Sequence, residues 1–126
     1  MRVWVDGWQE ECCGDGFAVG DAVAWPVGAP DAAFLGALLG DVTVAYAQET
    51  HDEASAEVAG TVVAIHRVSA RVARDAKDRV YRAVAGTGLA LPVASAGVVG
   101  EATGRQFFGW VVELDGAEVR PPRPPG

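Results

Sequence analysis

The 126-residue chain has little cysteine and almost no lysine. Its two cysteines, Cys12 and Cys13, are adjacent, and Lys77 is the single lysine among ten basic residues. Disulfide frameworks need cysteines spaced along the chain and an oxidising compartment, so this sequence does not belong to that class of small secreted domain. Seventeen acidic residues give a formal net charge of −7. That sign makes nucleic acid an unfavoured partner, because phosphate binding needs positive charge.

Long apolar runs and common catalytic motifs are also missing. No stretch reaches the roughly 20 apolar residues of a membrane-spanning helix, and the first six residues do not form the apolar segment of a signal peptide. We therefore expect a cytoplasmic protein with no membrane partner. The sequence contains no phosphate-binding loop, dinucleotide fingerprint, nucleophile elbow, HExxH motif or EF-hand loop. We expect no cofactor, and the sequence favours a protein that is not an enzyme.

What is present suits one folded domain. Half of the residues are hydrophobic and 21% are charged, which is far from the composition of disordered chains. A chain of this length can bury roughly two thirds of its surface. We expect a single β-rich domain over residues 1–119. Residues 120–126 carry four prolines that cannot join a sheet, and they are expected to form a disordered proline-rich tail.

The hydrophobic pattern predicts several short strands and a short helix. Asp31 precedes an apolar segment that ends before Gly40, which is typical of an N-cap, a helix over 31–39 and a terminating glycine. Alternating or β-branched segments separated by glycine turns predict strands. They cover residues 2–8, 17–27, 42–47, 60–68 and 106–114. The fold class expected is mainly β, a small barrel or sandwich of the SH3-like or OB-like kind.

Residues 69–85 fit two structures equally well. Valines and alanines recur every four residues, and pairs such as Arg71 with Asp75 place opposite charges four residues apart, which favours a possible second helix. The β-branched valines, and the absence of a break after residue 68, favour a hairpin that turns at 75–78 instead. The sequence does not decide between them.

The opening segment carries a family resemblance. Val3-Trp-Val-Asp-Gly-Trp-Gln9, Cys12-Cys-Gly14, Phe17-Ala-Val-Gly-Asp21 and Val23-Ala-Trp25 resemble an uncharacterised actinobacterial family known as a domain of unknown function. Later segments, Gly60–Ile65 and Gly109–Leu114, are similar to its later parts. The resemblance implies a single-domain cytosolic protein and supplies no activity, cofactor or catalytic residue.

Cysteine and histidine are the candidate metal ligands. Adjacent residues of a strand point to opposite faces, so Cys12 and Cys13 are poorly placed to share one metal, for which CxxC spacing is typical. With His51 and His66 they supply the residue types of a Cys₂His₂ site, at separations that match no zinc finger. A small thiol- or metal-dependent enzyme or sensor using these four residues is the alternative function.

Tryptophan is abundant for a chain of this size. Trp4, Trp8, Trp25 and Trp110 are the candidate binding residues, because aromatic side chains on a sheet surface can stack on a ligand. Trp4 and Trp8 share a predicted strand face with Asp6, which suits an exposed surface better than a dry core. The competing interpretation is that they pack on the short helix or on the barrel end.

These observations give one preferred hypothesis and one more remote. The preferred hypothesis is a non-enzymatic binding or accessory module that uses an aromatic sheet surface, or an edge strand near Pro26, to hold a protein partner or a second copy of itself. The remote one is binding of single-stranded nucleic acid. It would need a basic face made by Arg67, Arg71, Arg74, Arg79 and Arg82, among which Asp75 and Asp78 weaken the field.

Overall fold

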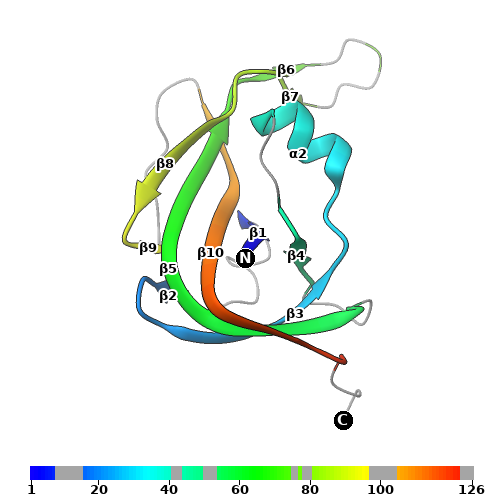
Figure 1. Ribbon diagram of the computed structural model, residues 1–126. Coiled ribbons are helices and arrows are strands. Elements are labelled where there is room, and N and C mark those ends of the chain that lie inside the picture. Colours follow the sequence, from blue (N-terminus) through cyan, green and yellow to red (C-terminus); the bar gives the residue numbers. More distant parts are fainter. Residues whose placement is uncertain are drawn as a thin grey trace.

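Two long curved strands, β5 (Ala56–Ala70) and β10 (Gln106–Arg120), dominate the fold (Figure 1). The computed structural model describes residues 1–7, 16–40, 44–49, 54–74, 77, 81–96 and 105–122. β5 and β10 pair antiparallel, and the register shifts at three places along β10. Such bulges bend a strand and increase its twist. The bending lets the two strands wrap around a core instead of forming a flat ribbon.

The principal sheet closes on itself. Its order is β10, β1 (Arg2–Asp6), β4 (Tyr46–Gln48), β3 (Ala22–Gly28), β5 and β8 (Leu89–Val93), and β5 also pairs with β10. β1 and β4 are parallel, whereas the other pairs of this sheet are antiparallel. A short ladder joins β2 (Phe17–Ala18) to β9 (Ser95–Ala96). The mainly β class predicted from the sequence is confirmed, and the closed ring fits the expected small barrel or sandwich.

The core is divided between the two faces of the ring. Val3 and Val5 point inward and join one buried cluster, while Trp4 between them points outward and joins another. This is the alternation expected of a strand covered on both faces. The inner cluster also contains Val27, Val58, Val62, Ile65, Trp110, Val112 and Leu114.

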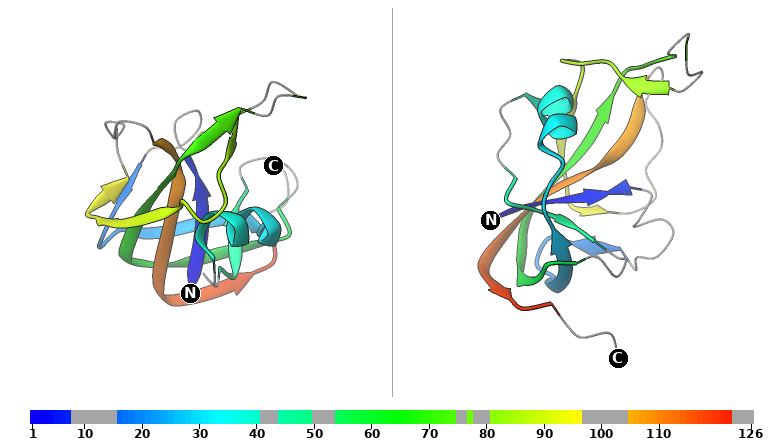
Figure 2. Two further views of the ribbon diagram at one scale, coloured as in Figure 1. Left: turned by 90° about the horizontal axis from the view of Figure 1, so that it is seen from above. Right: turned by 90° about the vertical axis from the view of Figure 1, so that its right-hand side faces the viewer.

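The helix α2 (Ala32–Leu39) covers part of the outer face of the ring, close to β1 and β4 (Figures 1 and 2). Asp31 caps it as predicted, because its Oδ1 accepts a hydrogen bond from the Phe34 N–H at 2.9 Å. Leu35 and Leu38 pack on Trp4 and on the outward side chains of β5 and β10. No helix in the described ranges has the length and apolar character needed to cross a membrane.

The possible helix over 69–85 is wrong. β5 continues to Ala70, and β6 (Val72–Arg74) pairs antiparallel with β7 (Tyr81–Ala83), so the segment is a hairpin. The charge pairs that suggested a helix each contribute only about 0.2–0.5 kcal/mol. Extension of the β5 ladder and the β-branched valines outweigh that small preference.

Candidate functional site

Two hollows lie on the outer face of the ring, near opposite ends of α2. The first, which we call the acidic cleft, has a volume of about 370 Å³ and lies between β1, the end of β3, β4 and the start of α2. The second, the His66 hollow, has a volume of about 270 Å³ and lies between β5, β8, β10 and the end of α2. The helix therefore separates two spaces of different chemistry.

Carboxylates from three different elements converge on the acidic cleft. Asp6 ends β1, Asp31 caps α2 and Glu49 follows β4 directly. Parallel pairing of Val3 with Tyr46 and of Trp4 with Ala47 brings the ends of β1 and β4 together. The described lining contains no basic residue. Its members are Trp4, Asp6, Gly28, Ala29, Asp31, Phe34, Leu35, Ala47, Gln48 and Glu49.

Aromatic rings form one wall of the cleft and fix its first carboxylate. Trp4 Nε1 donates a hydrogen bond to Asp6 Oδ1 at 2.9 Å, which is possible because residues two apart in a strand lie on one face. Phe34 meets the Trp4 ring edge to face, with centroids 6.1 Å apart. The indole is thus held between α2 and Asp6, and it orients the carboxylate toward the cleft.

The surroundings of Asp6 in the cleft disfavour the ionised form of its carboxyl group. Partial burial raises the pKa of Asp6 above 3.8, and repulsion from Glu49 raises it further, while the Trp4 hydrogen bond opposes both effects. Each cause follows from elementary rules: loss of water and a like charge both penalise the ionised form, and a donor stabilises it. Asp6 and Glu49 are therefore close enough to repel each other across the cleft.

The side chain of Gln48 lies on the inner face of the ring, because Gln48 is in register with Val27 and alternates with Ala47. Its side chain is 8% exposed, it belongs to the cleft lining, and its Oε1 has no hydrogen-bond partner among the described residues. Buried side-chain oxygens in proteins nearly always accept a hydrogen bond, because leaving one unmade costs about 1–3 kcal/mol. The unpaired oxygen therefore belongs to the inner face of the ring, and the polar character of the cleft comes from its three carboxylates.

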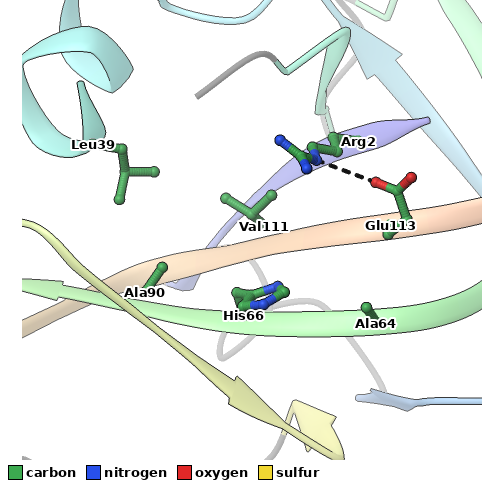
Figure 3. A pocket seen from close by; sticks show the side chains of 7 residues that line it. All are labelled: Arg2, Leu39, Ala64, His66, Ala90, Val111 and Glu113. Atoms are coloured by element: carbon green, nitrogen blue, oxygen red, sulfur yellow. Dashed lines mark ion pairs between the residues drawn. The ribbon is translucent and has the colours of Figure 1, made fainter. Parts of the chain in front are cut away.

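The His66 hollow is mainly apolar, and its charges are balanced (Figure 3). Arg2 Nε lies 3.4 Å from Glu113 Oε2, and Figure 3 shows this ion pair at one end of the hollow. His66 lies on β5 between the side chains of Ala64 and Ala90, opposite Val111. The lining of this hollow thus contains an arginine paired with a carboxylate, whereas the charged residues in the described lining of the acidic cleft are all carboxylates.

The four candidate tryptophans do not form one surface. Trp4 is 3% exposed and packs on the short helix, which is the competing interpretation given above, but it also lines the acidic cleft. Trp110 is 2% exposed in the inner core and does not lie on the sheet surface. Trp25 is half-buried against Phe17, with centroids 5.0 Å apart. Trp8 lies outside the described residues. The helix α2 covers Trp4, and Trp110 lies inside the ring. These two tryptophans therefore do not belong to a continuous exposed aromatic surface.

Pro26 lies within β3, which pairs with β5 on one side. Pro26 is in register with Glu57, and its carbonyl accepts a hydrogen bond from the Glu49 N–H at 2.8 Å. Among the described residues, the other side of 22–25 pairs with no strand. An edge in this region agrees with the position of the proline.

The proposed metal and thiol residues are mostly outside the described ranges. Cys12, Cys13 and His51 fall there, and of the four only His66 is placed, in its own hollow. Within the described ranges, no three carboxylate, histidine or cysteine side chains are close enough together to hold a metal ion. The thiol- or metal-dependent alternative stays a prediction.

The arginine face considered for nucleic acid lacks one of its members. Arg67 is buried and lies over the Phe107 ring, 5.0 Å from the centroid. Arg71, Arg74 and Arg82 are exposed, and Arg79 is outside the described residues. Arg67 is therefore a structural residue of the ring end, and the basic face is smaller than the sequence suggested.

Sequence reasoning did not identify Gln48 and Glu49 as site residues. They directly follow the predicted strand over 42–47, and polar residues at the end of a strand are the only local signal they give. Their meeting with Asp6 depends on the parallel pairing of β4 with β1, about 40 residues away along the chain. No local pattern reports a contact of that kind.

Comparison with known proteins gives one result that bears on identity. No curated protein and no solved structure matches the chain significantly. One family model matches residues 1–116, described as a family of unknown function, DUF6578. That span includes β1, α2 and β4, and so every described residue of the acidic cleft. The match covers most of the chain and agrees with the resemblance of the opening segment: the chain belongs to the family of unknown function DUF6578.

Proposed function

We propose that this chain is a non-enzymatic binding module whose ligand site is the acidic cleft. The observation that carries the proposal is the convergence of Asp6, Asp31 and Glu49 with an aromatic wall in one space of about 370 Å³. Ligand sites commonly enclose about 300–1,000 Å³ and combine an apolar lining with a few converging polar groups. The cleft has both properties.

The ring explains why such a site would be well positioned. Trp4, Asp6 and Ala47 are carried by paired strands, and Asp31 and Phe34 by a capped helix that packs on those strands. Side chains on regular elements are held more precisely than side chains on loops. We propose that a group on a partner protein enters the cleft, and that the protein acts in the cytoplasm.

The proposal is tested by heteronuclear NMR of the whole chain with small probes of each charge class: acetate, methylurea and methylguanidinium. We expect at least one probe to shift the Trp4 indole N–H, which is bonded to Asp6, together with the amides of Ala47 and Gln48. The Trp110 indole N–H, buried in the inner core, is the internal control and should not move.

Two outcomes would contradict the proposal. One is that no probe perturbs the resonances of the cleft at millimolar concentration. The other is that the perturbations gather around His66 and Val111, which would assign the ligand site to the His66 hollow.

A further inference from the structure

We propose that the interior of the ring binds one ordered water molecule, which bridges Trp110 on β10 and Gln48 on β4. Two buried polar atoms carry the inference: Trp110 Nε1 is a donor, Gln48 Oε1 is an acceptor, and neither has a hydrogen-bond partner among the described residues. The two side chains are 2% and 8% exposed. Buried polar groups are nearly always bonded to protein or to ordered water. This site lies on the inner face and is independent of the acidic cleft.

The strand register places the two side chains in one layer of the ring interior. Val5 on β1 is in register with Trp110, and the parallel register of β1 with β4, continued by one residue, places Gln48 on the other side of Val5. Val27 on β3 is in register with Gln48. Val5, Val27 and Trp110 all belong to the inner cluster. Gln48 and Trp110 therefore flank Val5 on the same face of the sheet.

The separation of the two strands suits a bridge through one small molecule. Neighbouring strands lie about 4.7–4.9 Å apart, so the Cα atoms of Trp110 and Gln48, two strands apart, are separated by roughly 9–10 Å. A bridging water holds its two partner atoms roughly 4.5–5.5 Å apart, because each hydrogen bond is about 2.9 Å long. Side chains that point into a closed ring converge. Val5, between them, offers only methyl groups and satisfies neither atom.

The chemistry of the two atoms selects water. One is a donor and the other an acceptor, so an ion of either sign would satisfy only one of them. Water both donates and accepts, and buried waters typically make two to four such bonds. The rings that pack on Trp110, Phe17 and Phe107, have centroids 5.9 and 4.7 Å from its own and supply no strong acceptor for the indole. The acidic cleft and the His66 hollow lie on the outer face, so neither offers a larger ligand room beside this pair.

The bridge would connect two strands that do not pair with each other. β4 is three residues long and is separated from β10 by β1 in the sheet order. A water-mediated hydrogen bond is enthalpically nearly as good as a direct one. The water therefore holds β4 against the strand that closes the ring.

The experiment is a crystal structure of the full chain at a resolution that shows ordered waters, combined with NMR of the same chain in solution. We expect a density peak of one water within about 3.2 Å of both Trp110 Nε1 and Gln48 Oε1. In solution, the Trp110 indole proton should show a nuclear Overhauser effect to water of the sign that marks a long-lived contact. The Trp4 indole proton, which is bonded to Asp6, is the internal control and should show none.

A matched pair of variants assigns the contact to Gln48. Gln48→Met removes the acceptor at nearly constant side-chain length, so the water contact of the Trp110 indole should be lost and its proton should shift upfield. Gln106→Met makes the same change at an exposed position on β10 and should leave the contact unchanged. Amide spectra confirm that each variant is folded, and the measurements on the unmodified chain do not depend on either variant.

Three results would overturn the inference. The first is a direct hydrogen bond between Trp110 and Gln48 in the crystal. The second is density larger than one water at this position, which would make the interior a site for another ligand. The third is a water contact that persists in Gln48→Met. None of these results affects the acidic cleft, whose probes report on the opposite face of the sheet.

Discussion

At the scale of single residues, Asp6 is the position where stability and binding oppose each other. Burial and Glu49 raise its pKa, so the folded state holds its proton more tightly than the unfolded state does. Between the ordinary and the raised pKa the folded protein binds more protons, and the contribution of Asp6 to stability therefore falls as the pH rises. At neutral pH the ionised carboxylate destabilises the fold.

The first prediction follows from that sign. Asp6→Asn keeps an oxygen that can accept from the Trp4 indole and removes the charge, so we expect a higher Tm at neutral pH. Well below pH 3.8, where the carboxyl is protonated in both states, the Tm values should be equal. Thermal unfolding followed by circular dichroism checks this, with Asp115→Asn as the surface control. A lower Tm at neutral pH would contradict the account.

A second prediction concerns pH and binding. A cationic probe of the cleft such as methylguanidinium is attracted by ionised Asp6, so its affinity should fall as the pH is lowered from neutrality through the raised pKa of Asp6, by about tenfold once Asp6 is protonated. Asp31 on α2 and Glu49 beside β4 also face the ligand and contribute to the profile. In Asp6→Asn the decline should begin at lower pH. Identical profiles in the two proteins would exclude Asp6 from the site.

Part of the candidate site was visible in the sequence, and part was not. Strand alternation predicts that Trp4 and Asp6 share one face, and the sequence around Asp31 predicts a helix cap, but of these three residues the sequence identified only Trp4 as a candidate binding residue. An exposed position for Trp4 is wrong, and the alternative, packing on the short helix, is the one that the structure shows. The position of α2 over β1 is a tertiary choice that local patterns do not encode.

At the scale of elements, α2 depends on its first residue. Asp31 both caps the helix and contributes a carboxylate to the cleft. We expect Asp31→Ala to lower the free energy of unfolding by about 1 kcal/mol. Asp31→Asn retains a capping oxygen, so it should preserve stability while weakening methylguanidinium binding. Chemical denaturation and calorimetry measure the two effects. Equal stability losses in both variants would show that charge, and not the cap, holds the helix.

Strand β10 approaches β1 too closely for a side chain at Gly109. A Cβ there would meet the Val5 carbonyl oxygen and lie 2.8 Å from the Trp4 ring. We expect Gly109→Ala to reduce stability by about 1–3 kcal/mol or more, because backbone must move. Gly36→Ala is the matched control: nothing lies near its Cβ, and alanine in a helix should add about 0.5–1 kcal/mol. A neutral Gly109→Ala would disprove the close packing of β1 on β10.

Elements with a strong local signal were predicted well, and those decided by pairing were not. The helix after Asp31 has its cap, its apolar residues and its terminal glycine within ten residues, so the sequence is sufficient. Residues 69–85 carry helical spacing and strand-forming valines together. Their hairpin is selected because β5 extends to Ala70, and that extension depends on β8 and β10, which lie elsewhere in the chain.

At the scale of the whole molecule, the ring joins the two ends of the described chain. β1 lies between β10 and β4, and the Met1 and Leu114 backbones exchange hydrogen bonds of 2.9 and 2.7 Å. We therefore expect the cleft on the outer face to depend on the pairing of β1 with β10, because β1 carries Trp4 and Asp6. Ligand recognition and global folding are coupled, since the strand that carries Trp4 and Asp6 is held on one side by the last strand.

Because the ring needs β10, the end of β10 determines how far the chain can be shortened from its C-terminal side. β10 continues to pair with β5 as far as Arg120, which is in register with Glu57, four residues beyond the family match. We expect a chain ending at Arg120 to keep its Tm within about 2 °C, or roughly 0.5 kcal/mol, and its methylguanidinium affinity. A chain ending at Arg105 lacks β10 and should be unfolded, with no dispersion in its amide spectrum. A large loss of stability on removing residues 121–126 would show that the proposed tail is part of the domain.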